Sequence, residues 1–213
     1  MALQNQVGSS MSSHNLLRIL LTLLFISTLI HAASTSSSST TTNSLKAYKM
    51  FIKDECNSTT YPDVCYKSLS PYASKVKNNP LTLTKLSVNV ALKAAKSAYS
   101  TLKKLSNSTG KLTRGETSVI ADCRENIDET LDLLKQSVDG LAHLNGTTTS
   151  DEKFQWDTIK TWMSAAITDE STCTDEFDEM KVRPSLQKKI KPSVANVAWM
   201  NSNALAFVNR LYY

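Results

Sequence analysis

Glycine and proline are scarce in this chain of 213 residues, with five of each. Both residues interrupt regular structure, so their scarcity leaves long stretches free to form helices. No stretch alternates apolar and polar residues in the way that is typical of a half-buried strand. Leucine, alanine, lysine and serine are common instead. The composition therefore predicts an all-α protein.

Histidine is also rare, and only His143 lies beyond the first 33 residues. Serine and cysteine hydrolases usually need a histidine base, and zinc sites usually need cysteine or histidine pairs such as CxxC, which this sequence lacks. His143 stands near an expected helix end, which is typical of a surface residue. The carboxylates of Glu125 and Glu129 could do acid–base work, but they lie on an exposed face with no evident pocket. We therefore expect no enzyme activity, no metal site and no cofactor.

Positively charged residues only slightly outnumber negatively charged ones. The net charge is +5, and it becomes +4 without residues 1–33, which contain Arg18 and no acidic residue. The lysines and arginines are scattered, and no basic run is interleaved with aromatic residues. We expect no nucleic-acid partner, and the excess supports at most a weak affinity for an acidic matrix.

The longest apolar run extends from Leu16 to Ile30, with Arg18 near its start and two alanines after it. It is shorter than the roughly 20 residues that a membrane span needs. This pattern is typical of a secretory signal peptide, which we place at residues 1–33. We expect a secreted, extracellular protein with no membrane association after signal removal. Residues 34–44 are nearly all serine and threonine and predict a disordered leader.

Four cysteines in a secreted chain predict disulfides. Cys56 and Cys65 are nine residues apart. On one straight helix their Cα atoms would be about 13 Å apart, whereas a disulfide tolerates only about 7 Å. If these two pair, the chain must turn between them, for which Tyr61-Pro62 is a suitable position, and form a helical hairpin. Cys123 and Cys173 would then pair by elimination.

After the hairpin, which we place at residues 45–78, residues 79–213 contain four long stretches with the apolar spacing of amphipathic helices. Asn79 is a good cap for the first helix, and a T-x-x-E capping box at Thr113 begins the second. Pro192 either kinks the last helix or marks the start of its regular part. Short connections between these helices predict an antiparallel four-helix bundle.

The second bundle helix, expected around residues 119–144, has one acidic face. Its apolar residues recur in steps of three and four, which predicts one buried stripe. A polar stripe lies nearly opposite, at about 100° per residue. We name it the acidic ridge, and it comprises Glu125, Glu129, Asp132, Gln136 and Asp139. The third bundle helix carries a second polar stripe, formed by Ser164, Thr168, Thr172 and Asp175.

Three N-x-S/T sequons predict surface positions that could carry N-linked glycans in a secreted protein. Their asparagines are Asn57, Asn107 and Asn145. All three fall at expected turns or helix ends. We therefore treat them as candidate glycosylation sites.

Four short stretches occur in a distinctive order: CNSTTYPDVCYKSL from Cys56, VIADCRENIDETLDLL from Val119, WMSAAITDESTCTDEF from Trp162 and SNALAFV from Ser202. Together with the cysteine spacing they resemble the plant invertase and pectin methylesterase inhibitor family, over nearly all of the expected mature chain. The resemblance implies a four-helix bundle with an N-terminal helical hairpin. It also implies disulfides that join the first cysteine to the second and the third to the fourth.

The resemblance further implies inhibition of a cell-wall carbohydrate enzyme through a one-to-one complex. In the pectin methylesterase branch, the second and third bundle helices cover the pectin-binding cleft of the enzyme. A cleft that binds an anionic polymer should offer cations to an acidic ridge. We therefore predict a pectin methylesterase inhibitor that is monomeric when free. The positions that match the inhibitory interface of the family are Glu125, Glu129, Asp132, Thr172 and Asp175.

The invertase branch of the family provides the alternative target, an acid invertase. Those inhibitors insert a Pro-Lys-Phe segment before the last helix into the invertase active site. The corresponding segment here, KVRPSLQKK, keeps Pro184 but has Ser185 and Leu186 in place of lysine and phenylalanine. This departure favours the esterase. The family also occurs as the pro-region of pectin methylesterases, and because this sequence ends at Tyr213 we expect a stand-alone inhibitor.

Overall fold

The structure is a computed structural model, and it describes residues 13–107, 112–145 and 149–211. The chain forms two compact units, residues 1–46 and residues 47–213. Every regular element among the described residues is helical. None of the helices in these ranges combines the length and the apolar character that crossing a membrane would require.

Helix α1 spans Ser13–Cys56, so the described backbone is already helical at residues 34–44. The disordered leader at residues 34–44, which the serine and threonine content led us to expect, stays a prediction. No glycine or proline occurs between Ser9 and Tyr61, so no residue there is a strong helix breaker. Serine and threonine lower helix propensity by less than about 1 kcal/mol each relative to alanine, which does not by itself end a helix that continues on both sides. The signal peptide at residues 1–33 stays a prediction.

In the second unit, the end of α1 and three short helices form the hairpin. They are α2 (Pro62–Leu69), the 3-10 helix η1 (Ser70–Tyr72) and α3 (Ala73–Val76). A disulfide between Cys56 and Cys65 closes the turn, with the two Cα atoms 5.6 Å apart. The hairpin packs against the rest of the second unit around a second, smaller core, which comprises Ile52, Cys56, Cys65, Leu69, Ala73, Val76, Leu83 and Phe207.

Asn203 attaches the turn of the hairpin to the last helix of the bundle. Its side chain is buried, and its Oδ1 accepts a hydrogen bond from the Tyr61 backbone N–H at 2.9 Å. Its Nδ2 donates to the Tyr61 carbonyl at 3.0 Å. One amide side chain thus satisfies both backbone groups of a residue that lies 142 positions away in the sequence.

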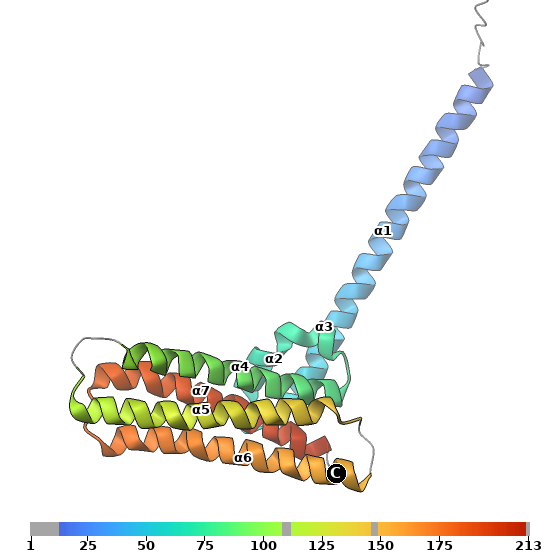
Figure 1. Cartoon of the computed structure of the whole chain (residues 1–213). Helices are drawn as coiled ribbons and strands as arrows, with labels where there is room; N and C mark the ends of the chain where they lie inside the picture. Colours follow the sequence, from blue (N-terminus) through green and yellow to red (C-terminus); the bar gives the residue numbers. More distant parts are fainter. Residues whose placement is uncertain (1–12, 108–111, 146–148, 212–213) are drawn as a thin grey trace, which may run out of the picture. The chain divides into compact units, whose positions relative to one another are not determined.

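The four long helices of the bundle are α4 (Pro80–Ser106), α5 (Arg114–Ala142), α6 (Ser150–Glu179) and α7 (Pro184–Leu211). Helix α5 packs against α4 and α6, and α7 completes the bundle by packing against the same two helices (Figure 1). Successive helices run in opposite directions. The antiparallel four-helix bundle with an N-terminal hairpin is confirmed.

The helix boundaries follow local signals in the sequence. Asn79 Oδ1 accepts a hydrogen bond from the backbone N–H of Thr82 at 2.8 Å, as expected of an N-cap. Both hydrogen bonds of the capping box between Thr113 and Glu116 are present. Helix α7 begins at Pro184, so Pro192 lies inside the helix and does not mark its start.

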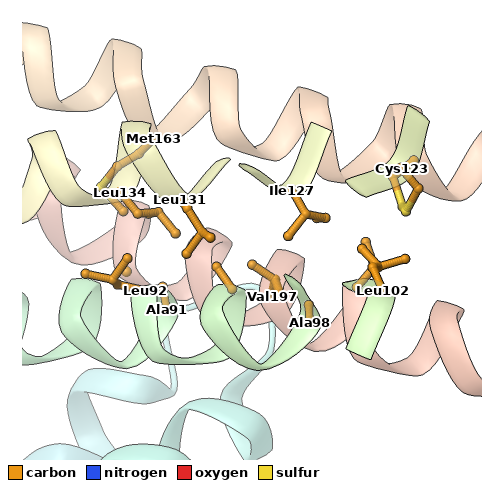
Figure 2. Close-up of a cluster of buried hydrophobic side chains, with 14 of the residues drawn as sticks. Ala91, Leu92, Ala98, Leu102, Cys123, Ile127, Leu131, Leu134, Met163 and Val197 are labelled. Atoms are coloured by element: carbon orange, nitrogen blue, oxygen red, sulfur yellow. A yellow bond between two sulfur atoms is a disulfide. The ribbon is translucent and has the colours of Figure 1, made fainter. Parts of the chain in front are cut away.

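The core of the bundle lies between the apolar stripe of α5 and the facing helices. Figure 2 shows the α5 side chains directed toward α4, with Met163 of α6 and Val197 of α7 beside them. Small alanines on α4 allow the two helices to approach closely. The labelled residues from α5 and α4 are Cys123, Ile127, Leu131, Leu134, Ala91, Leu92, Ala98 and Leu102. Because this stripe is buried, the opposite face of α5 is left for solvent or a partner.

Candidate functional site

The acidic ridge lies on the exposed face of α5. Glu125, Glu129 and Asp132 are all exposed, as their position opposite the buried stripe requires. Asp132 forms an ion pair with Lys135 on the same helix, with Nζ and Oδ1 2.7 Å apart. Both side chains are more than half exposed, so this pair contributes little to stability and a partner's cation could replace the lysine.

A disulfide and a hydrogen bond set the register between α5 and α6. Cys123 and Cys173 are joined, with their Cα atoms 4.4 Å apart. Seven residues further along α5, the hydroxyl of Thr130 donates to the Ala166 carbonyl of α6 at 3.4 Å. Both contacts fit one antiparallel register. The two disulfides of the structure therefore have the pairing that the family resemblance implied.

This register sets how the predicted interface residues of α5 and α6 lie relative to one another. Glu125 lies level with Thr172, and both are exposed. The hydroxyl of Thr172 donates to the Thr168 carbonyl of its own helix at 3.0 Å. Asp175 is exposed as well and lies two positions after Cys173, just as Glu125 lies two positions after Cys123. At about 100° per residue, each of these two acids is turned about 160° from the disulfide that joins the helices. Asp175 is therefore turned away from the contact between α5 and α6 by the same angle as Glu125.

The structure adds a feature that the sequence analysis did not identify, in which acidic side chains of α5 and α6 approach one another. Asp122 and Glu129 come from α5, and Asp169 and Glu176 come from α6. We name these four residues the acidic seam. Asp169 Oδ2 and Glu176 Oε2 are buried and have no hydrogen-bond partner among the described residues.

Burial and like charge both disfavour the ionised forms in the seam. Burial first, and then the neighbouring Glu129 carboxylate, raises the pKa of Asp169 from 3.8 to about 6. Burial also raises the pKa of Glu176, with Asp122 and Glu179 acting in the same direction. Keeping these carboxylates ionised at neutral pH therefore costs the free protein some stability.

A pattern in the sequence could have revealed the α6 half of the seam. Asp169, Thr172, Glu176 and Glu179 follow one another in steps of three, four and three, so they share one face of a helix. The stripe that we predicted on this helix lies further from α5. Choosing between these two adjacent stripes requires knowing which side of α6 packs against α5, and that is a tertiary property.

A buried polar pair lies between α6 and α7. It consists of Glu170, which follows Asp169 in the sequence, and Asn201. Glu170 is 1% exposed and Asn201 is 0% exposed. The amide nitrogen of Asn201 donates to the Met163 carbonyl at 3.1 Å, whereas its oxygen has no partner among the described residues. Burial raises the pKa of Glu170 well above its usual value, although the neighbouring Asn201 acts in the opposite direction. A protonated Glu170 has a hydroxyl to donate, and the Asn201 oxygen is a suitable acceptor.

The segment KVRPSLQKK, which corresponds to the invertase motif, is held in place by Glu116 of α5. The carboxylate of Glu116 accepts hydrogen bonds from Nε and Nη2 of Arg183, each at 2.8 Å. The Arg183 hydrogen bond, and then the Thr113 N–H, lower the pKa of Glu116 to about 2. Leu186 follows in the first turn of α7 and is only 7% exposed. Its side chain therefore belongs to the core and is not available for insertion into an enzyme.

The three candidate glycosylation asparagines, Asn57, Asn107 and Asn145, are all exposed. The first sequon lies entirely within the described residues, and the buried hydroxyl of Thr59 donates to the Cys56 carbonyl at 2.8 Å. The other two sequons extend to residues 108–109 and 146–147, which lie outside the described residues. Glycan attachment at all three sites stays a prediction.

The sequence model of the family described as plant invertase/pectin methylesterase inhibitor matches residues 50–207. The chain belongs to this family. Pectinesterase inhibitor 9 of Arabidopsis thaliana is 39% identical to it over 163 residues, which cover 75% of this chain and 79% of that protein. A 21 kDa protein of Daucus carota is 37% identical over 159 residues, which cover 75% of this chain and 82% of that protein.

A solved structure of the family supports the same architecture. The crystal structure of a mutant form of a pectin methylesterase inhibitor from Arabidopsis superposes with a TM-score of 0.57 and 18% sequence identity. The match covers 72% of this chain and 92% of that chain. At this level of identity the likeness concerns the fold, so the choice of enzyme has to be argued from the side chains.

Proposed function

We propose that this protein inhibits a pectin methylesterase by binding it through α5 and α6 in a one-to-one complex. The names of several relatives, among them pectinesterase inhibitor 9 and pectinesterase inhibitor 10 of Arabidopsis thaliana, support this target. The observation that carries the binding surface is the acidic seam, with its buried carboxylate oxygens that lack hydrogen-bond partners among the described residues. Unpaired acceptors and like charges are unfavourable in the free protein. A cationic side chain of the enzyme, placed at the seam, would relieve both.

Inhibition by this surface needs no chemical step. An enzyme that binds anionic pectin should have cationic groups along its cleft, and the exposed carboxylates of the acidic ridge complement them. Charge complementarity also speeds the encounter of the two proteins. Once bound, α5 and α6 would cover the cleft and exclude the polymer. Such an inhibitor would act outside the cell, in agreement with the predicted signal peptide.

The way in which the segment KVRPSLQKK is held at the start of α7 favours the esterase over an acid invertase as the target. Arg183 is bound to Glu116, and the Leu186 side chain is buried. Insertion of this segment into an enzyme would require breaking the ion pair and exposing an apolar side chain. The exposed part of α5 and α6 requires no such rearrangement.

The test is a titration of the purified, oxidised protein against a plant pectin methylesterase and an acid invertase in parallel. We expect a stoichiometric loss of esterase activity alone. Charge reversal on the ridge, Glu129→Lys with Asp132→Lys, should abolish it. The matched control is Asp54→Lys with Asp63→Lys, which makes the same change of charge at two exposed residues of the hairpin and should keep full inhibition.

Two results would contradict the proposal. Loss of invertase activity alone would move the inhibitory surface to the segment before α7 and leave the ridge as a solvated face. Equal loss of inhibition in the ridge variant and the hairpin control would show that only net charge matters. Circular dichroism of each variant establishes that the helices are intact.

A further inference from the structure

The charges of the bundle are strongly segregated between its helices. Helix α5 holds seven acidic residues and α6 holds nine, which together make 16 of the 19 in the chain. Helices α4 and α7 hold five and four cationic residues and no acidic residue. Since α4 and α7 pack against each other, the bundle has a basic side in addition to its acidic one.

Most of the cations on this side form no ion pair within the described residues. Lys85, Lys191 and Arg210 bind the Leu144 carbonyl, Asp178 and Glu55, respectively. Among the exposed lysines that form no ion pair within the described part of the chain, eight lie on α4, on α7 and at the α3 end of the hairpin. We name them the basic face, and they are Lys75, Lys77, Lys93, Lys96, Lys103, Lys104, Lys188 and Lys189.

The lysines of α4 lie along one flank of the helix. Lys93, Lys96 and Lys104 fall within an arc of about 80° at about 100° per residue, and Lys103 lies at its edge. From Lys93 to Lys104 they extend over about 16 Å of the helix, at about 1.5 Å per residue. This is the arrangement of an elongated anionic ligand site, since each cation can contact a different unit of the ligand.

A groove between α4 and α7 opens beside this row. It has a volume of about 260 Å³, and Lys93 and Ser97 of α4 line it together with Asn196 and Met200 of α7. Tyr72 of η1 forms its edge. The groove thus combines a cation for a carboxylate, a hydroxyl and an amide for sugar hydroxyl groups, and an aromatic and a thioether surface for the apolar face of a sugar ring.

We propose that the basic face and this groove bind a polyuronate chain, a saccharide polymer with free carboxylates. The inference rests on the proposed function, because removal of methyl esters from pectin leaves free carboxylates along the polymer. The protein would then hold an esterase through α5 and α6 and the product of that enzyme through α4 and α7. Its retention would increase where de-esterified polymer accumulates.

The surface chemistry favours a polyuronate over other anionic partners. A lipid surface would be expected to take up several exposed apolar side chains next to the lysines. Among the described residues of α4 and α7, however, the exposed large apolar side chains are limited to Trp199, and its ring packs on Tyr61 with the ring centroids 5.8 Å apart. A single-stranded nucleic acid usually needs several aromatic side chains to stack its bases, whereas only Tyr72 lines this groove. Neutral hydrogen-bonding groups between cations suit a polymer of sugar acids.

The test measures equilibrium binding of the oxidised protein to polygalacturonate, to fully methyl-esterified pectin and to dextran sulfate, at low and moderate salt. We expect binding to polygalacturonate and none to the esterified polymer. The triple variant Lys93→Glu, Lys96→Glu and Lys104→Glu should lose about tenfold in affinity, equivalent to about 1.4 kcal/mol. The matched control makes the same change of charge elsewhere, at the exposed residues Lys53, Lys153 and Lys181, and should lose less than threefold.

A second variant separates sugar recognition from charge. Asn196→Ala with Tyr72→Ala should weaken binding to polygalacturonate and leave binding to dextran sulfate unchanged. Equal losses in the two lysine triples would overturn the proposal, and so would dextran sulfate binding as tightly as polygalacturonate.

Esterase inhibition, measured on the same samples, keeps the two proposals apart. Inhibition without polyuronate binding rejects only the groove, and polyuronate binding without inhibition rejects only the esterase as the target.

Discussion

Replacement of Asp169 by asparagine should make the protein more stable at neutral pH. The carboxylate is partly buried in the acidic seam, and its Oδ2 has no hydrogen-bond partner among the described residues. Burial, followed by the repulsion from Glu129, raises its pKa from 3.8 to about 6. Asparagine has nearly the same shape and carries no charge. The substitution therefore removes an unfavourable ionisation and keeps the packing.

The sign and size of the effect follow from the two pKa values. Because the pKa is higher in the folded protein, the folded state binds more protons than the unfolded state between pH 3.8 and about 6. The free energy of unfolding of the wild type should therefore fall as the pH rises through this window. A shift of about two pKa units corresponds to about 3 kcal/mol, and partial exposure to solvent reduces this to about 1–2 kcal/mol. In a domain of this size, that changes the melting temperature by about 2–8 °C.

Urea unfolding at pH 4 and pH 7 measures this effect. Asp169→Asn should unfold at a higher urea concentration than the wild type at pH 7, and at nearly the same concentration at pH 4. The matched control is Asp175→Asn, which changes an exposed carboxylate of the same helix and should behave like the wild type at both pH values. Equal stabilisation by both substitutions, or none by Asp169→Asn at pH 7, would refute the assignment of the cost to burial in the seam.

The same substitution should weaken inhibition of the esterase. The seam is unfavourable in the free protein, and in the proposed complex a cation of the enzyme would be its partner. Asp169→Asn would remove an acceptor for that cation, so affinity should decrease while stability increases. A trade-off of this kind is common at binding sites.

Three further predictions concern the scaffold. Asn203→Ala leaves the backbone N–H and C=O of Tyr61 without their side-chain partner, and it should lower the free energy of unfolding by about 1–3 kcal/mol in urea titrations. Leu134→Ala removes a side chain that is 0% exposed, so it should cost about 2–5 kcal/mol, whereas Leu134→Met should cost less than about 1.5 kcal/mol. Glu116→Gln should destabilise the protein at pH 7, because the pKa of this carboxyl is lowered from 4.5 to about 2 by its hydrogen bonds from Arg183 and Thr113. That difference from the wild type should shrink as the pH falls from 4.5 to 2 in thermal unfolding scans, and a constant difference would argue against the ion pair.

The pKa values of Glu116 and Asp169 are shifted in opposite directions, so the stability of the protein should pass through a maximum as the pH changes. Stability from Glu116 is complete above pH 4.5 and is lost as the pH falls toward 2, whereas the cost of ionising Asp169 grows from pH 3.8 to about 6. We therefore expect the wild type to be most stable in mildly acidic solution. Measurement of the melting temperature from pH 3 to pH 8 tests this, and a steady rise toward pH 8 would contradict it.

The sequence by itself determined the features that depend on neighbouring residues along the chain. The helix starts at Asn79 and Thr113 rest on hydrogen bonds within one turn, so a short motif is sufficient to place them. The exposure of the acidic ridge depends only on the helical repeat and on the burial of the opposite stripe. The turn between Cys56 and Cys65 follows from the length of a helix compared with the reach of a disulfide.

Only the tertiary structure decided which charges meet. The acidic seam exists because the register between α5 and α6 brings Glu129 near Asp169, and the pattern within either helix cannot specify that register. Glu116 was expected to cap a helix, and it does so, but it also binds Arg183 from a segment 67 residues away. Electrostatic interactions and desolvation depend on distances through space, whereas the helical repeat records only distances along the chain. Helix positions could therefore be read from the sequence, and the chemistry between helices could not.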